Sequence, residues 1–166
     1  MALRRGNLQE AEALFREALA IMEQASGPVS ADAALVLGNV GFALHQQGRP
    51  AEAVPFFQRA LDVRRQVHGD SSLHVAWRLY ALAEALRDLG RYEEAEAAHR
   101  ESVALRRLHF PEGDFEVARG LDGLARVLID RGNYAEALET LEEAVRSTGH
   151  TMAIPSILRS GHWSAT

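Results

Sequence analysis

The chain has 166 residues, of which 47% are hydrophobic and 25% are charged, a balance that suits one compact domain or one short repeat array. Its formal net charge of -5 argues against nucleic acid as the main partner, because phosphate binding needs a concentrated basic surface. It contains no cysteine and no lysine, which excludes disulfides, thiol nucleophiles, cysteine-based metal sites, Schiff-base chemistry and a phosphate-loop lysine.

The first predicted element is a helix over residues 8–25, which overlaps the phrase Gly-Asn-Leu-Gln-Glu-Ala at 6–11. Matching phrases, with glycine first and Glu-Ala last, recur every 42 residues, at 48–53, 90–95 and 132–137. A fixed period of this length is the signature of stacked structural repeats. The helix over 8–25 has no predicted partner before it, so we expect its apolar residues Phe15, Leu19 and Met22 to be partly exposed.

Three helix pairs follow, over residues 31–66, 72–108 and 115–147. In the second pair, Leu79, Leu82, Ala83 and Leu86 have the three-one-three spacing of one helical stripe, and the other pairs repeat it. The small residue in each stripe lets two antiparallel helices approach closely, and the glycine between them supplies a left-handed turn. The tail, residues 149–166, is expected to be a short capping helix or partly disordered.

This pattern resembles the tetratricopeptide repeat, in which a leucine-rich stripe precedes the turn and an alanine, an aromatic residue and a second alanine follow it. The family's standard unit has about 34 residues. The longer 42-residue unit, with His74-Val-Ala76 and Glu116-Val-Ala118 opening first helices, resembles the kinesin light-chain class, which bacterial proteins also use widely. The resemblance covers about residues 3–148, and arginine without lysine indicates a GC-rich bacterial genome.

The resemblance implies an all-α fold of about three and a half repeats in a right-handed superhelix, residues 1–148, acting as a protein-interaction module. In this family the first helices line the concave side and bind a peptide or a partner helix. The positions that match are Leu35, Asn39, Phe42, His45, Trp77, Tyr80, Glu84, Arg87, Arg119, Asp122 and Arg126. We expect Trp77 to contribute most, because aromatic residues near arginines anchor binding surfaces; the alternative is that it fills space between pairs.

One binding mode of the family is not favoured. Its clamp for a C-terminal carboxylate needs lysines and asparagines in the inner columns. The chain has no lysine, and of the aligned Asn39, Ala81 and Gly123 only one is asparagine. The inner-face asparagines of kinesin light chains are also mostly missing.

The remaining polar residues do not indicate an enzyme or a metal site. His68, His74 and His109 lack the spacing of helical metal ligands, and we interpret them as solvated loop residues, whereas His99 replaces an aromatic residue and should be packed. No serine lies in a Gly-x-Ser-x-Gly turn. We therefore expect no catalytic residue, metal or other cofactor.

The arginine pairs Arg64-Arg65 and Arg106-Arg107 are one repeat feature that occurs twice. The negative end of a helix dipole accounts for their placement at the ends of second helices. A basic stripe for an acidic partner is the alternative.

The partner expected from the sequence is a protein or peptide, with no nucleic acid and no membrane. No stretch approaches the roughly 18 apolar residues of a membrane-spanning helix. Residues 1–10 have no apolar run of the signal-peptide kind, so we expect a cytoplasmic location. The alternative function is a self-associating or scaffolding segment of a larger regulatory protein, forming a homodimer through the exposed ends of the array.

Overall fold

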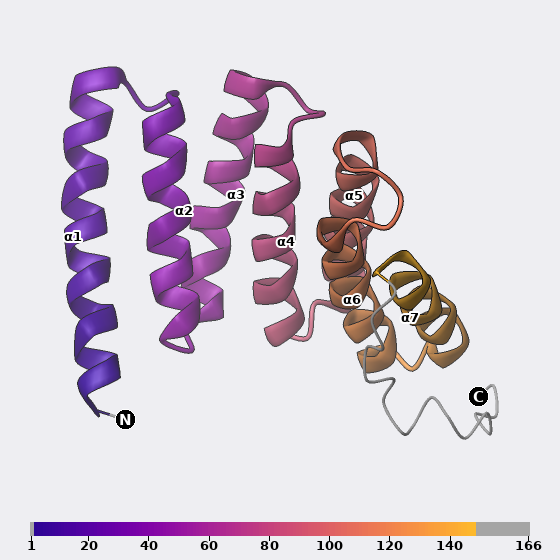
Figure 1. The fold of residues 1–166 in the computed structure, drawn as a ribbon. Helices are drawn as coiled ribbons and strands as arrows, with labels where there is room; N and C mark the ends of the chain where they lie inside the picture. Colours follow the sequence, from indigo (N-terminus) through magenta and orange to yellow (C-terminus); the bar gives the residue numbers. More distant parts are fainter. Residues whose placement is uncertain (1, 149–166) are drawn as a thin grey trace.

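The computed structural model describes the backbone of residues 2–148 and the side chains of residues 7–146. Every regular element in this part of the chain is a helix, which confirms the all-α prediction (Figure 1). The helices are α1 (Ala2–Ser26), α2 (Ala31–Gln46), α3 (Pro50–His68), α4 (Leu73–Asp88), α5 (Tyr92–His109), α6 (Phe115–Asp130) and α7 (Tyr134–Thr148). The predicted tail, 149–166, lies outside the described residues.

The 42-residue period is expressed in the residues that start and end the first helices. The side chain of a capping residue accepts a hydrogen bond from a backbone N–H in the first turn, and these capping residues are Ser30, Ser72 and Asp114. The glycine after each first helix has a φ near 75° to 80°, which L side chains rarely adopt; the values are 76° at Gly48, 73° at Gly90 and 80° at Gly132. The predicted left-handed turns are therefore confirmed.

The helices stack in chain order, each packing on the next, and Figure 1 shows them side by side along one axis. Among the first helices, α4 also contacts both α2 and α6 directly, which makes the three helices one layer of the array. The close approach within a pair depends on the small residue of the stripe: a Cβ on Gly41 would lie 2.8 Å from Cδ1 of Phe57, which is fully buried. His99, which takes the place of Phe57 one unit later, is also fully buried, as expected.

The exposed end of the array differs from the expectation. Phe15 and Met22 of α1 are partly exposed as predicted, but Leu19 is buried, with only 8% of its surface accessible, because it packs with Leu37 of α2. The exposed apolar residues of α1 are Leu14 and Ile21, at 59% and 53%. They are one position before Phe15 and Met22, so the unpaired face of α1 is rotated from the one predicted.

The two arginine pairs separate into an inner and an outer arginine. Arg65 extends to Glu101 of the next second helix, with 2.7 Å between nitrogen and oxygen, and Arg107 pairs with Glu143 in the same way. Both lie in the last turn of their helix, as the dipole argument requires. Arg64 and Arg106 are instead buried, at 7% and 0% exposure, so the dipole alone does not account for them.

Candidate functional site

A cavity of about 630 Å³ lies against the layer formed by α2, α4 and α6. This size is typical of ligand-binding clefts. We call it the groove, and it is lined by Gly38, Asn39, Phe42, His45, Gln46, Phe57, Trp77, Arg78, Tyr80, Ala81, Glu84, Arg106, Glu116 and Arg119.

One part of the groove is apolar and accessible. Phe42 of α2 is 55% exposed and Trp77 of α4 is 40% exposed, although both are large apolar side chains. The indole of Trp77 is held on one side by His74, whose ring meets it edge-on at 5.4 Å between centroids. Burying these two side chains under a ligand would remove apolar surface from water, which is the main source of binding free energy.

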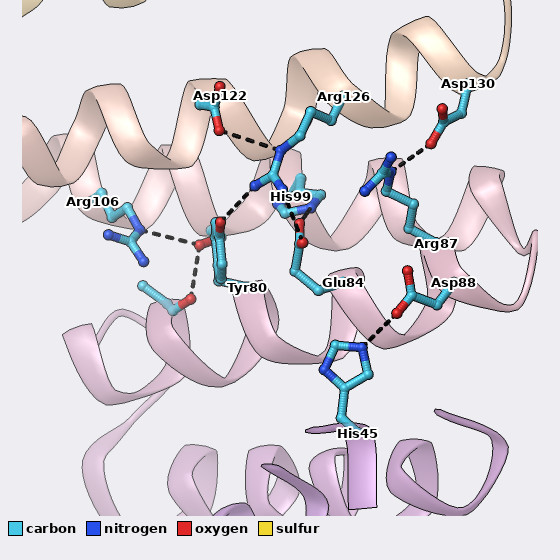
Figure 2. A network of polar contacts seen from close by, with 12 residues as sticks. His45, Tyr80, Glu84, Arg87, Asp88, His99, Arg106, Asp122, Arg126 and Asp130 are labelled. Carbon is cyan, nitrogen blue, oxygen red and sulfur yellow. Dashed lines mark hydrogen bonds and ion pairs between the residues drawn. The ribbon is translucent and has the colours of Figure 1, made fainter. Parts of the chain in front are cut away.

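Next to this part lies a network of charged and polar side chains on α4 and α6, of which Tyr80 and Glu84 line the groove (Figure 2). Arg126 is its centre: it donates to the hydroxyl of Tyr80 at 2.9 Å and forms ion pairs with Glu84 at 3.3 Å and Asp122 at 3.2 Å. Arg87 of α4 likewise forms an ion pair with Asp130 of α6. These pairs connect α4 to α6 and fix the positions of their side chains.

Glu84 is the most enclosed carboxylate of this network. One of its oxygens lies 3.2 Å from Nε2 of the buried His99, and the other faces Arg126. Burial opposes the ionisation of Glu84, but the contact with His99 and the positive charge of Arg126 outweigh it, so the pKa of Glu84 lies below its ordinary value. Glu84 is therefore ionised at neutral pH.

A second ion pair connects α5 to the start of α6. Arg106 is fully buried, and it donates to both the side chain and the backbone carbonyl of Glu116, the latter at 3.0 Å. Its guanidinium also lies 5.5 Å from the ring centre of Tyr80. Burial lowers the pKa of Arg106 from its ordinary value, but a guanidinium remains charged, so Glu116 neutralises it.

Seven of the eleven side chains selected from the sequence line the groove: Asn39, Phe42, His45, Trp77, Tyr80, Glu84 and Arg119. Arg87, Asp122 and Arg126 belong to the ion-pair network beside it. Leu35 is 47% exposed on α2 but does not line the cavity. His45 forms a 2.7 Å contact with Asp88 of α4, so its ring is positioned rather than free (Figure 2).

Sequence reasoning missed three charged residues of the groove, namely Arg78, Arg106 and Glu116. Arg106 was interpreted through the helix dipole, and Glu116 lies in the first turn of α6, where an acidic residue needs no further explanation. The period does align Arg64 with Arg106 and His74 with Glu116. It does not indicate that the arginine contacts the residue at the start of the following first helix, across a loop.

His68 and His74 were interpreted as solvated loop residues, and this is incomplete. They lie in the last turn of α3 and the first turn of α4, and their rings stack with 4.6 Å between centroids. Among the described residues no group of three or more histidine, cysteine, aspartate or glutamate side chains has an arrangement that could hold a metal ion. In the same part of the chain, no helix is long and apolar enough to span a membrane.

Comparison with protein families gives a match over most of the chain. A family model described as Tetratricopeptide repeat matches residues 1–64 and 32–107, and a second model of the same description matches residues 117–151. A search of the curated proteins found no match.

Several solved structures have the same fold at low sequence identity. BtubC (BKLC) from P. vanneervenii is 18% identical, with a TM-score of 0.81; the match covers 91% of this chain and 62% of that one. A kinesin light chain-type protein from Podosopora anserina, with nearly identical TPR-like repeats, is 21% identical with a TM-score of 0.79, over 90% of this chain and 71% of that one.

A Rap protein complexed with competence and sporulation factor is 17% identical with a TM-score of 0.74, over 87% of this chain and 39% of that one. The chain thus spans less than two thirds of the length of BtubC and of the Rap protein. The superhelical fold agrees with the sequence prediction, including its likeness to kinesin light-chain repeats.

Proposed function

The chain belongs to the tetratricopeptide repeat family, and from this membership we propose that it is a non-catalytic protein-interaction module that binds an extended peptide or a partner helix in the groove. The observation that carries the proposal is the pair of accessible aromatic residues, Phe42 and Trp77, beside a groove of ligand-binding size. A structural relative, the Rap protein, was solved with competence and sporulation factor bound, which supports a ligand on this fold.

The polar part of the groove suits recognition better than chemistry. Glu84 and Glu116, the two carboxylates that line it, are each paired with an arginine, so neither is a free base. An extended backbone or a helix end could use the outer atoms of these ion pairs as hydrogen-bonding partners. The aromatic part would supply affinity and the fixed charges would supply orientation.

The experiment is selection of peptides from a random library by the purified chain. We expect recovered peptides to share a motif and to bind with micromolar affinity, which corresponds to about −8 kcal/mol. A Phe42→Ala, Trp77→Ala double variant should weaken binding by about thirtyfold or more, as truncation of aromatic anchors does.

Leu108→Ala is the matched control for this selection. Leu108 is 70% exposed on α5 and does not line the groove, so its removal should leave binding unchanged. If the aromatic double variant binds the selected peptides as tightly as the control does, the peptides do not occupy the groove and the proposal fails.

A second candidate function, self-association through the end of the array, is favoured by the exposed Leu14 and Ile21 of α1. One unit later Ile21 corresponds to Val63, which is 4% exposed, and two units later Leu14 corresponds to Ala98, which is 8% exposed. These positions are buried in the described residues of the later units, except that Phe56, one unit after Leu14, is partly exposed. Sedimentation equilibrium at micromolar concentration should show a dimer that a Leu14→Gln, Ile21→Gln variant converts to a monomer; a wild-type monomer would exclude this function.

A further inference from the structure

One arginine beside the groove is buried without an acidic partner. Arg64 of α3 is 7% exposed, and the one hydrogen bond it makes to a described residue joins its Nη1 to Nε2 of His68 at 2.9 Å. An arginine can only donate, so this histidine nitrogen accepts the hydrogen bond and brings no negative charge. Hence the positive charge of Arg64 is not neutralised by its neighbour.

A second arginine without an acidic partner among the described residues lies on α4, the helix that packs next to α3. Arg78 of α4 places its guanidinium directly on the backbone of Gly38, where a Cβ would come within 1.9 Å of its Nη1. Arg78 lines the groove and forms no hydrogen bond or ion pair with any residue that the structure describes. Its pKa is lowered first by burial and then by the positive charge of Arg64. On α4 it lies four residues after His74, and so on the same face of the helix.

The repeat shows what is missing at this place. One unit later, Arg106 occupies the position of Arg64, and Glu116 occupies the position of His74. Glu116 binds Arg106, and a glycine, Gly120, stands where the second unit has Arg78. At these positions, the junction of α3 and α4 thus has one acid fewer and one arginine more than the junction of α5 and α6. The nearest acidic influence on Arg64 is Asp32 of α2, which is exposed and not within ion-pair distance.

We propose that Arg64, His74 and Arg78 form an oxyanion site beside Trp77, which binds a carboxylate or phosphate group in the place that Glu116 fills in the next unit. The source of that group rests on the proposed function: it is an acidic residue of the bound peptide. Charge-assisted bonds from a guanidinium to an oxyanion are roughly twice as strong as neutral ones, so a desolvated arginine pair is well suited to this ligand.

The position of the site agrees with a ligand that also covers the aromatic residues. His74 contacts Trp77 edge-on, and Trp77 is the next groove residue along α4 from Arg78. A peptide that places an apolar side chain against Phe42 and Trp77 would bring the neighbouring residue to Arg78. The site therefore predicts an acidic position next to the apolar one in the recovered motif.

The site is tested first without a peptide, using the side-chain Nε–Hε NMR signals of Arg64 and Arg78. Sodium sulfate and sodium acetate are titrated at constant ionic strength against sodium chloride. In the wild type we expect saturable shifts of both signals. Arg78→Gln should weaken sulfate binding by about tenfold or more, since it removes one charged donor. Non-saturating shifts, or the same affinity in Arg78→Gln, would overturn the site.

His74→Glu separates the site from a general effect of charge. This variant supplies in the chain the carboxylate that Glu116 supplies one unit later, so it should abolish the saturable shifts while melting at or above the wild-type temperature. Arg87→Gln is the matched control, because it removes an arginine that is outside the site and paired with Asp130. Loss of sulfate binding in Arg87→Gln as in Arg78→Gln would mean that net charge alone is responsible.

The source of the oxyanion is tested by the peptides recovered from the library. An acidic position that is enriched with the wild type and lost with Arg78→Gln supports the peptide as the source. Peptides that depend on Phe42 and Trp77 but lack an acidic position would overturn that source and leave the proposed function standing. Saturable sulfate binding with no recovered peptide would leave the site standing for a free anion and remove the proposed function.

Discussion

Arg64 and Arg106 occupy the same position in successive units, but only Arg106 has an acidic partner in the described part of the chain. Arg106 of α5 is fully buried and bound by Glu116 of α6, so its charge is neutralised within the chain. Arg64 is 7% exposed, and His74 stands at the position that corresponds to Glu116. The next helix adds a second cation, Arg78, whose pKa is lowered by burial and by the charge of Arg64. The comparison teaches that the arginine itself is a feature of the repeat, whereas its counter-charge is specific to one unit. It is the unit without the acid that carries the accessible Trp77.

The largest effect on stability should come from Glu116→His, which gives the third unit the residue that the second unit has at this position, His74. This change leaves the buried Arg106 with only the backbone carbonyl of residue 116 and the hydroxyl of Ser102, which is 3.4 Å from its Nε. We expect a loss of about 3 kcal/mol in the free energy of unfolding, as for other broken buried pairs. Urea denaturation measures it; a loss below about 1 kcal/mol would show that Arg106 does not need the carboxylate.

Two glycines, Gly120 beside Arg106 and Gly38 beside Arg78, should differ in how much stability is lost when each is replaced by alanine. A Cβ on Gly120 would lie 2.9 Å from Cγ2 of the buried Val103 and 3.2 Å from Cδ of Arg106, neither of which can move freely. Gly120→Ala should therefore cost about 1–2 kcal/mol. Gly38→Ala meets only the end of the flexible Arg78 side chain, so it should be neutral or stabilising by up to about 1 kcal/mol, since alanine favours the helix.

Urea denaturation of both variants sharpens this comparison, with sulfate titration as its second readout. Because Gly38→Ala displaces the Arg78 guanidinium, it should weaken sulfate binding even where it stabilises the fold. Equal losses of stability in the two variants would mean that Arg78 is held as rigidly as Val103.

His74→Glu makes the second unit like the third and should have a smaller effect with the opposite sign. The new carboxylate would face Arg64 and Arg78, and we expect a gain of roughly 1 kcal/mol, the typical net contribution of a partly exposed charged contact. Thermal unfolding checks the direction. A lower melting temperature for His74→Glu would show that the two arginines are already neutralised in the wild type.

The smallest effect concerns pH. Partial burial, and then the electrostatic influence of Arg64, His68 and Arg78, lower the pKa of His74 below the roughly 6.5 of an unfolded chain. Among other nearby groups, Asp32 lies on α2, and His109 of α5 contacts the carbonyl of Ser71. Since the unfolded state binds this proton more readily, His74 lowers stability as the pH falls from about 6.5 toward its folded pKa.

His74→Gln removes this part of the pH dependence and provides the comparison. Its free energy of unfolding should fall less than that of the wild type between neutral pH and pH values below the folded pKa of His74. Bound sulfate should raise the pKa of His74, which NMR titration of the ring protons measures. A His74 pKa that stays unchanged with saturating sulfate would contradict the proposed site.

The sequence predicted the fold because the fold is set by local, periodic features. Left-handed turns at Gly48, Gly90 and Gly132 need glycine, and the stripe around Leu79 and Leu82 needs a partner helix, so both can be recognised without knowing distant contacts. The period even aligned Arg64 with Arg106 and His74 with Glu116. It did not show that a second-helix arginine meets the start of the following first helix, since this contact crosses a loop between units.

By itself, the sequence of this protein determined the helices, the turns, the 42-residue unit and a set of inner-face positions. The tertiary structure alone decided which of those positions form the groove, that Arg64 and Arg106 are buried, and that Leu14 and Ile21 rather than Leu19 are exposed on α1. The physical reason is that backbone conformation depends on neighbours in sequence. Burial and charge pairing depend instead on the rotation of each helix against the next, which many weak contacts set together.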